Sequence, residues 1–403
     1  MFSYHERWRP KLTTLLVVLS PLAAVAQHRF SEGPVQIHGF FSQGYAVSDQ
    51  NNYLTMNTSK GTAQMTDGGV NLTWKINHKL RVGAQAYSRY IGEFGKGRVT
   101  LDWAVVDYRL KDWLGFRAGK VKTPLGLFND AQDQEFLYTW ALLPQAVYPL
   151  DLRDMTIAHV GGGIYGAIGM KRAGSLSYQV YAGSMPSDPR SGYVYGIEDS
   201  GFRNVRDSGR GTGYDLRWDT PLTGLSLGVS GMFQQRDLAG RLAAAPIAVS
   251  AKNYMNRRTA VYGQFSRGRW RFDGEWRHLK GLTRIYGLPP ARSRAGQDTT
   301  GWFLALSCRI SKRVEVGTYR SQYDYTPLFT PPVLLTGPGA NHIYDTTATV
   351  RFDLARFWNF KIEGHFMDGF GNLLSFRGFY PRSHPQGLRP TTNLLVLRTG
   401  FTF

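Results

Sequence analysis

The last stretch of the chain alternates strictly between two kinds of side chain. One parity is largely apolar and ends in an aromatic residue, and the other is small or polar apart from one valine. Because successive side chains of a β-strand point to opposite faces, this period of two predicts a closing strand with two different faces. The first parity carries Leu395, Leu397, Thr399, Phe401 and Phe403, and the second carries Val396, Arg398, Gly400 and Thr402.

The same alternation recurs along the chain, most clearly over residues 80–89, 270–277 and 358–367. In each segment one face is apolar and the other is charged or small. A soluble β-sandwich would also bury one apolar face, so alternation alone does not decide between the two architectures. Aromatic residues at strand ends favour a membrane, because amphipathic rings prefer the interface. These residues are Trp270, Trp302, Trp358 and Phe403.

We predict sixteen strands, with fourteen or eighteen as the alternatives. An even number places both ends of a single-chain barrel on one side. The expected strands are 35–47, 67–77, 79–91, 98–110, 113–122, 157–171, 175–185, 211–219, 224–236, 254–267, 269–281, 298–310, 312–325, 343–354, 357–370 and 392–403.

The connections between these segments alternate in length. Links after even-numbered strands are short, such as Asn77-His78 and Lys111-Asp112, whereas most links after odd-numbered strands are long. Tight turns on one side and long loops on the other are typical of a transmembrane barrel. The fold class we expect is therefore all-β, a transmembrane antiparallel β-barrel.

The N-terminal segment reads as an export signal. Three basic residues precede an apolar stretch from Leu12 to Ala26, which ends in Ala24-Val25-Ala26. This stretch is short for a membrane-spanning helix, which needs about 20 residues. We expect cleavage after residue 26, so that 1–26 is a signal peptide and 27–403 is a single barrel domain.

A short segment resembles a known family. Residues 114–126, together with the preceding 102–110, are similar to porins of the phosphate-selective O/P type and related sixteen-stranded porins. The resemblance implies a homotrimeric channel in the bacterial outer membrane, with one loop folded into the pore. It also implies that Phe403 is read by the barrel-assembly machinery.

The connection 123–156 is the candidate constriction loop. It is long for a loop, and its many aromatic and leucine residues are too apolar for a solvated segment. We expect it to pack against the inner wall, with a short helix over 133–143. The alternative is an external loop that packs on a neighbouring subunit.

The chain carries a formal charge of +19, and loss of Glu6, Arg7, Arg9 and Lys11 with the signal would leave +17. Such an excess favours anionic solutes or lipopolysaccharide, and export argues against nucleic acid. Cations in a pore favour anions, unless they are neutralised by wall carboxylates. The candidate pore-lining cations are Arg81, Arg89, Arg117, Lys120, Lys122, Arg217, Arg271, Arg277, Arg309, Arg351, Lys361 and Arg398.

No constellation points to an enzyme, a metal or a cofactor. The histidines are scattered, Gly161-Gly162-Gly163 lacks a following Lys-Ser/Thr, and the single cysteine, Cys308, shares the parity of an apolar face.

Three functions remain open. The first is an outer-membrane porin, a passive channel for small hydrophilic solutes that prefers anions. The second is a substrate-specific uptake channel for phosphate or organic anions. The third is a plugged structural or adhesive barrel.

Overall fold

The structure is a computed structural model that describes residues 33–185, 188–245, 247–290, 293–329, 335–372 and 377–403. The expected signal peptide, 1–26, lies outside the described residues. No helix in the described part of the chain is long and apolar enough to span a membrane.

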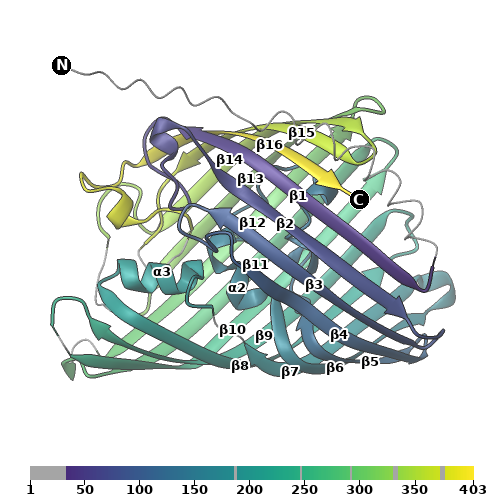
Figure 1. Ribbon diagram of the computed structural model, residues 1–403, viewed down its shortest axis with the longest axis horizontal. Helices are drawn as coiled ribbons and strands as arrows, with labels where there is room; N and C mark the ends of the chain where they lie inside the picture. Colours follow the sequence, from purple (N-terminus) through teal and green to yellow (C-terminus); the bar gives the residue numbers. More distant parts are fainter. Residues whose placement is uncertain (1–32, 186–187, 246, 291–292, 330–334, 373–376) are drawn as a thin grey trace, which may run out of the picture.

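Sixteen antiparallel strands form one closed barrel, in which each strand pairs with its neighbours in sequence and β1 pairs with β16 (Figure 1). The predicted fold class and strand number are confirmed. The strands are β1 (Val35–Ser48), β2 (Thr62–Lys75), β3 (Leu80–Ile91), β4 (Val99–Lys111), β5 (Leu114–Lys122), β6 (Ala158–Gly169), β7 (Ser175–Met185), β8 (Phe202–Asp219), β9 (Leu225–Leu242), β10 (Ala248–Arg267), β11 (Trp270–Tyr286), β12 (Arg294–Arg309), β13 (Val314–Pro327), β14 (His342–Ala355), β15 (Trp358–Asp368) and β16 (Thr391–Thr402).

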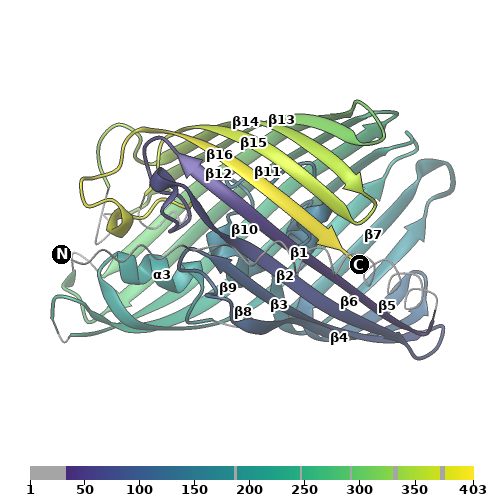
Figure 2. The same ribbon diagram turned by 45° about the horizontal axis from the view of Figure 1, so that its top comes forward.

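The seam between β1 and β16 closes on the last residue of the chain. Gly39 N donates to Phe403 O at 2.9 Å, and Phe403 N donates to Gly39 O at 2.9 Å. A Cβ at position 39 would lie 2.2 Å from the Phe403 ring, so only glycine leaves the ring its present place. Figure 2 shows β1 and β16 side by side, with the C-terminus at the end of β16.

The outer face of the barrel is apolar and carries tryptophan at one rim. Trp74, Trp113, Trp218, Trp270 and Trp358 are all exposed and lie next to short turns. A belt of amphipathic rings at one edge of an apolar band is the pattern of a barrel that spans a bilayer. We call this edge the short-turn end and the opposite edge the long-loop end.

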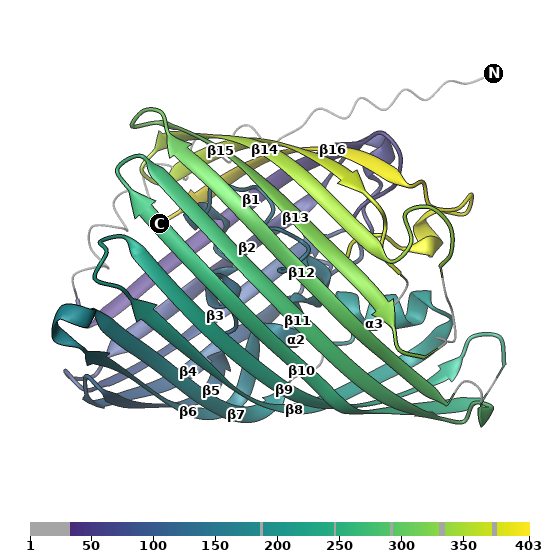
Figure 3. The same cartoon turned by 180° about the vertical axis from the view of Figure 1, so that it is seen from behind.

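Several strands are longer than the sequence predicted. The expected loops 237–253 and 282–297 are largely strand. β9 extends to Leu242 and β10 begins at Ala248, while β11 extends to Tyr286 and β12 begins at Arg294. The pairing passes an irregularity near Asn253, and a bulge of this kind lets a strand bend without ending. Figure 3, which views the barrel from behind, shows these long strands in front.

Short helices occur only in the connections of the described chain. They are η1 (Thr58–Lys60), η2 (Asn129–Ala131), η3 (Glu135–Leu137), η4 (Leu150–Leu152), α2 (Arg153–Thr156), η5 (Lys171–Ala173), α3 (Gly192–Asp199) and η7 (Pro381–Ser383). The side chain of Ser191 caps α3 by accepting from Val194 N at 3.2 Å. Figures 1 and 3 both draw α2 within the ring of strands and α3 toward the long-loop end.

Candidate functional site

The connection between β5 and β6, residues 123–156, folds into the barrel, and we call it the inward loop. Its apolar side chains form clusters with inward residues of the wall. Phe128 packs on Phe303 with ring centroids 6.0 Å apart, and Trp140 packs edge-on against Tyr319 at 5.1 Å. The loop is thus part of the interior of the barrel and narrows the space available to a solute.

Wall cations hold this loop by its backbone carbonyls. Five of the predicted pore-lining cations donate to inward-loop oxygens rather than facing open water. A buried carbonyl needs a donor, and a cation is a strong one. The contacts are Arg89 with Leu150 O, Arg277 with Val147 O and Leu125 O, Arg351 with Phe136 O and Tyr138 O, Lys361 with Glu135 O and Trp140 O, and Arg398 with Ala141 O, at 2.7–3.3 Å.

Wall carboxylates satisfy the amides of the same loop. Glu363 accepts from Ala141 N and Leu142 N, each at 2.8 Å, and Glu275 accepts from Leu127 N at 2.9 Å. The helix expected over 133–143 is wrong. Only η3 forms there, because these amides and carbonyls bond to wall side chains instead of to one another.

Four other predicted cations pair with carboxylates of the wall itself. Arg81 and Arg117 share Asp107, each at 2.9 Å. Arg271 pairs with Asp273 at 2.8 Å. Arg309 bridges two acids of neighbouring strands, Glu315 at 2.5 Å and Asp353 at 2.8 Å. Arg217 lies 5.4 Å from the centre of the Tyr262 ring.

The two lysines of β5 differ in placement. Lys122 pairs with Asp133 of the inward loop and lies 3.6 Å from Asp102. Lys120 stands opposite Val160, whose side chain is 46% exposed, and its Nζ donates to Leu101 O at 2.5 Å. Lys120 nevertheless lines a cavity of about 190 Å³ together with Arg81, Arg117 and Lys122.

One cation that the sequence reasoning missed is Arg258 on β10. It is 6% exposed and belongs to the inward row. In the described part of the chain it has no salt bridge, and its buried Nε has no hydrogen-bond partner. The Arg257-Arg258 doublet carried a signal, because two adjacent strand residues must face opposite sides of the wall.

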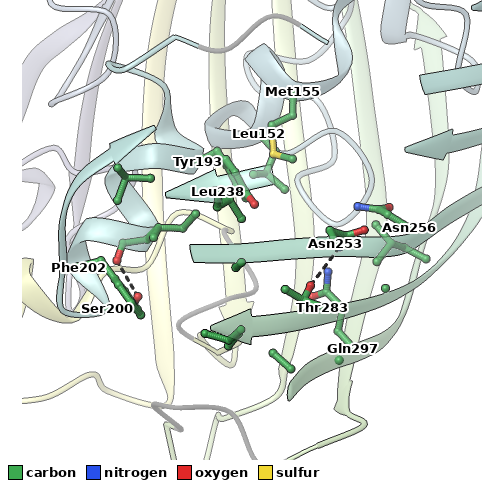
Figure 4. Close-up of a pocket in the computed structure, with 18 of the residues that line it drawn as sticks. Leu152, Met155, Tyr193, Ser200, Phe202, Leu238, Asn253, Asn256, Thr283 and Gln297 are labelled. Atoms are coloured by element: carbon green, nitrogen blue, oxygen red, sulfur yellow. Dashed lines mark hydrogen bonds between the residues drawn. The ribbon is translucent and has the colours of Figure 1, made fainter. Parts of the chain in front are cut away.

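Two cavities that share several lining residues lie beside Arg258. The mouth cavity, of about 190 Å³, lies between α3, the end of the inward loop and the inner faces of β8–β13. Figure 4 shows Leu152, Met155 and Tyr193 on one side of it and Asn253, Thr283 and Gln297 on the other. The narrow cavity, of about 40 Å³, lies deeper, where the inward loop faces β10–β13.

The narrow cavity is lined by three guanidinium groups, those of Arg258, Arg277 and Arg377. Arg277 is held by Glu275 at 2.6 Å, and Arg377 lies over the Tyr323 ring at 4.1 Å. Among the described residues, no carboxylate lines either cavity. An anion in the narrow cavity thus meets positive charge on the cavity surface.

The other half of the long-loop end is filled by an apolar cluster, which we call the mouth cluster. Side chains from six connections meet there, and they include Leu54, Phe94, Leu142, Tyr195, Ala340 and Tyr380.

Buried polar groups fasten the loops around the mouth cluster. Asp151 accepts from Gly378 N at 2.9 Å and from Tyr380 Oη at 2.8 Å, and burial raises the pKa of its carboxyl above the ordinary value. Asn52 N donates to His384 Nε2 at 2.7 Å, while His384 Nδ1 lies 2.8 Å from Tyr380 O. Because Tyr380 O can only accept, Nδ1 carries a hydrogen, and because Nε2 accepts from Asn52 N, Nε2 carries none. The imidazole ring is therefore neutral.

Comparison with known proteins gives the fold and no closer relationship. No protein-family model matches the chain, and no curated protein matches it. Among solved structures, an anion-selective porin from Comamonas acidovorans aligns with TM-score 0.56 at 12% identity, covering 92% of this chain and 99% of that one. The chain has the fold of outer-membrane porins.

Two further structures show the same likeness. OmpT, an outer membrane protein of Vibrio cholerae, aligns with TM-score 0.54 at 10% identity over 92% of this chain and 97% of its own. The outer membrane channel DcaP of Acinetobacter baumannii aligns with TM-score 0.52 at 8% identity over the same shares. The resemblance to the phosphate-selective type stays a prediction.

Proposed function

We propose that the protein is a passive channel of the bacterial outer membrane that favours small anions. The observation that carries this proposal is the narrow cavity, which is lined by Arg258, Arg277 and Arg377 and by no described carboxylate. Positive charge at a constriction lowers the energy of an anion there and raises that of a cation. The barrel itself supplies the route, with no need of an energy source.

The orientation follows from the barrel. The short-turn end faces the periplasm and the long-loop end faces the exterior, as in other barrels of this kind. Residues 1–26 direct export, and Phe403 addresses the chain to the assembly machinery. Arg190, Arg203, Arg206 and Arg210, in and after the connection that carries α3, would meet lipopolysaccharide phosphates.

We also propose that the channel is a homotrimer. One Vibrio cholerae OmpT structure with the same fold is described as a trimer form. Crosslinking of the native protein in outer-membrane fragments tests this point, and a monomer as the largest species would contradict it.

A planar-bilayer recording tests the channel. In a KCl gradient we expect the reversal potential to shift toward the equilibrium potential of chloride, and Arg377→Gln should make this shift smaller. A reversal potential on the potassium side would contradict the anion preference. Absence of any conductance would instead favour the plugged barrel.

A substrate-specific uptake channel is the second candidate. The mouth cavity favours it, because this cavity is small, about 190 Å³, and combines apolar side chains with Arg258 and Arg377. Current that saturates with one solute supports this candidate, and current that stays linear supports the general porin.

A further inference from the structure

We propose that the mouth cavity is a binding site for small carboxylates with an apolar body, and that Arg258 holds the carboxylate. The inference deepens the proposed function and rests on it in one respect, that solutes enter from the long-loop end. The site is defined by the inward faces of β10 and β11, the end of the inward loop and α3.

The charged end of the site is Arg258. Arg258 lines both cavities, as Arg377 does. The Arg258 residue is only 6% exposed, and within the described residues no acid pairs with it. Burying a cation without a partner is costly, and a bound anion would remove that cost.

The geometry of the group suits a carboxylate. A guanidinium presents parallel N–H donors that match the two oxygens of a carboxylate. Asn256, two residues earlier on the same inward row, also lines the mouth cavity, and its Oδ1 has no partner. If the side-chain amide of Asn256 rotates by half a turn, its NH₂ group takes the place of Oδ1 and can donate to the carboxylate.

Apart from Arg377 and polar side chains such as Asn253, Thr283 and Gln297, the rest of the cavity is lined by apolar residues, which favours a ligand with an apolar body. Leu152, Met155, Val249, Leu279, Ile285 and Tyr325 line it. An inorganic dianion would lose its hydration against these side chains with too few donors in return. A monocarboxylate can place its head on Arg258 and its body along the apolar wall.

The volume also limits the ligand. A cavity of about 190 Å³ is smaller than the sites that hold drug-sized molecules, which are roughly 300–1,000 Å³. A single ring or a short branched chain is the size that fits. Benzoate is therefore the probe.

Titration calorimetry of the detergent-solubilised full chain with benzoate tests the proposal. We expect saturable binding that Arg258→Gln weakens at least tenfold and Arg258→Lys weakens less. The matched control is Arg257→Gln, since Arg257 directly precedes Arg258 but is exposed on the opposite face of β10. Equal benzoate affinity in Arg258→Gln and the native chain would overturn the assignment.

Three further probes test the two parts of the ligand. Acetate lacks the apolar body, benzyl alcohol lacks the charge, and inorganic phosphate lacks the body and carries more charge. Each should bind at least tenfold more weakly than benzoate. Phosphate or acetate binding as tightly as benzoate would overturn the apolar half of the proposal.

A second variant guards against misfolding of Arg258→Gln. A Cβ at Gly281 would have ordinary contacts of 3.5 Å and more, so Gly281→Leu should fold and fill part of the cavity. It should abolish benzoate binding while Arg258 is still present, and retained affinity would count against the site. These titrations need no conductance, so a channel without anion preference that still binds benzoate would refute the proposed function and leave this site standing.

Discussion

Lys361 on β15 and Glu135 in the inward loop form an ion pair in which the lysine side chain has no exposed surface. The same Nζ donates to Glu135 O at 2.8 Å and to Trp140 O at 2.9 Å. One wall residue thus neutralises the buried Glu135 carboxylate and also holds the backbone of the inward loop in place.

Replacing that lysine should therefore destabilise the barrel. Lys361→Met leaves Glu135 buried without its partner, and breaking a buried pair in this way costs about 3–5 kcal/mol. We expect the band of the folded form on a denaturing gel to disappear at a lower heating temperature. The double variant Lys361→Met with Glu135→Gln should recover part of the loss. Lys312→Met, in an exposed turn, is the control and should leave the temperature unchanged.

Glu363→Gln should loosen the inward loop without unfolding the barrel. The carboxylate accepts from two loop amides, and a glutamine has only one oxygen to offer. Hydrogen bonds to a charged group contribute about 1.5–3 kcal/mol, so amide exchange at Ala141 and Leu142 should accelerate about tenfold or more. Mass-spectrometric hydrogen exchange measures this rate. Unchanged exchange would show that other contacts fix the loop.

Gly39→Ala should weaken the seam. The new methyl group would meet the Phe403 ring at 2.2 Å, and the ring must move away. Gly364→Ala on β15 is the matched control, because nothing lies within 4 Å of its Cβ position. We expect a lower heating temperature for loss of the folded band in Gly39→Ala only. A similar temperature in both variants would mean that the ring relocates at no cost.

The loops at the mouth should open more readily in acid. Burial lowers the pKa of His384, so the closed form keeps the ring neutral. Above about pH 6.5 the ring is neutral in both forms and has no effect; below it the open form binds a proton that the closed form resists. Amide hydrogen exchange in residues 377–390, corrected for its intrinsic pH dependence, should become faster as the pH falls from 7.5 to 5. His384→Gln should remove most of that rise, and a rise that persists would point to another titrating group.

The fold was predictable because its signals are local. Alternation over 358–367 and the short turns at 77–78 and 111–112 need only neighbouring residues to be recognised. The extent of β9 to β12 was not predictable in this way, since their outer ends are held by cross-strand pairs such as Ala248 with Arg241.

The site was only partly predictable. The inward face of Arg351 and Lys361 follows from alternation, but their acceptors lie more than 200 residues away in the inward loop. No local pattern reveals that a carbonyl of Tyr138 will meet Arg351. Arg258 was not predictable for the converse reason: among the described residues no acid pairs with it, and only the arrangement of the other strands reveals this.

The seam has a consequence for how such a polypeptide matures. Its opening strand can find its second neighbour only after the final strand has been delivered, so until then two rows of backbone hydrogen-bonding groups stand open. An incomplete chain would therefore expose two unpaired strand edges that can pair with other chains, and a protein that binds the chain before closure would protect it from aggregation.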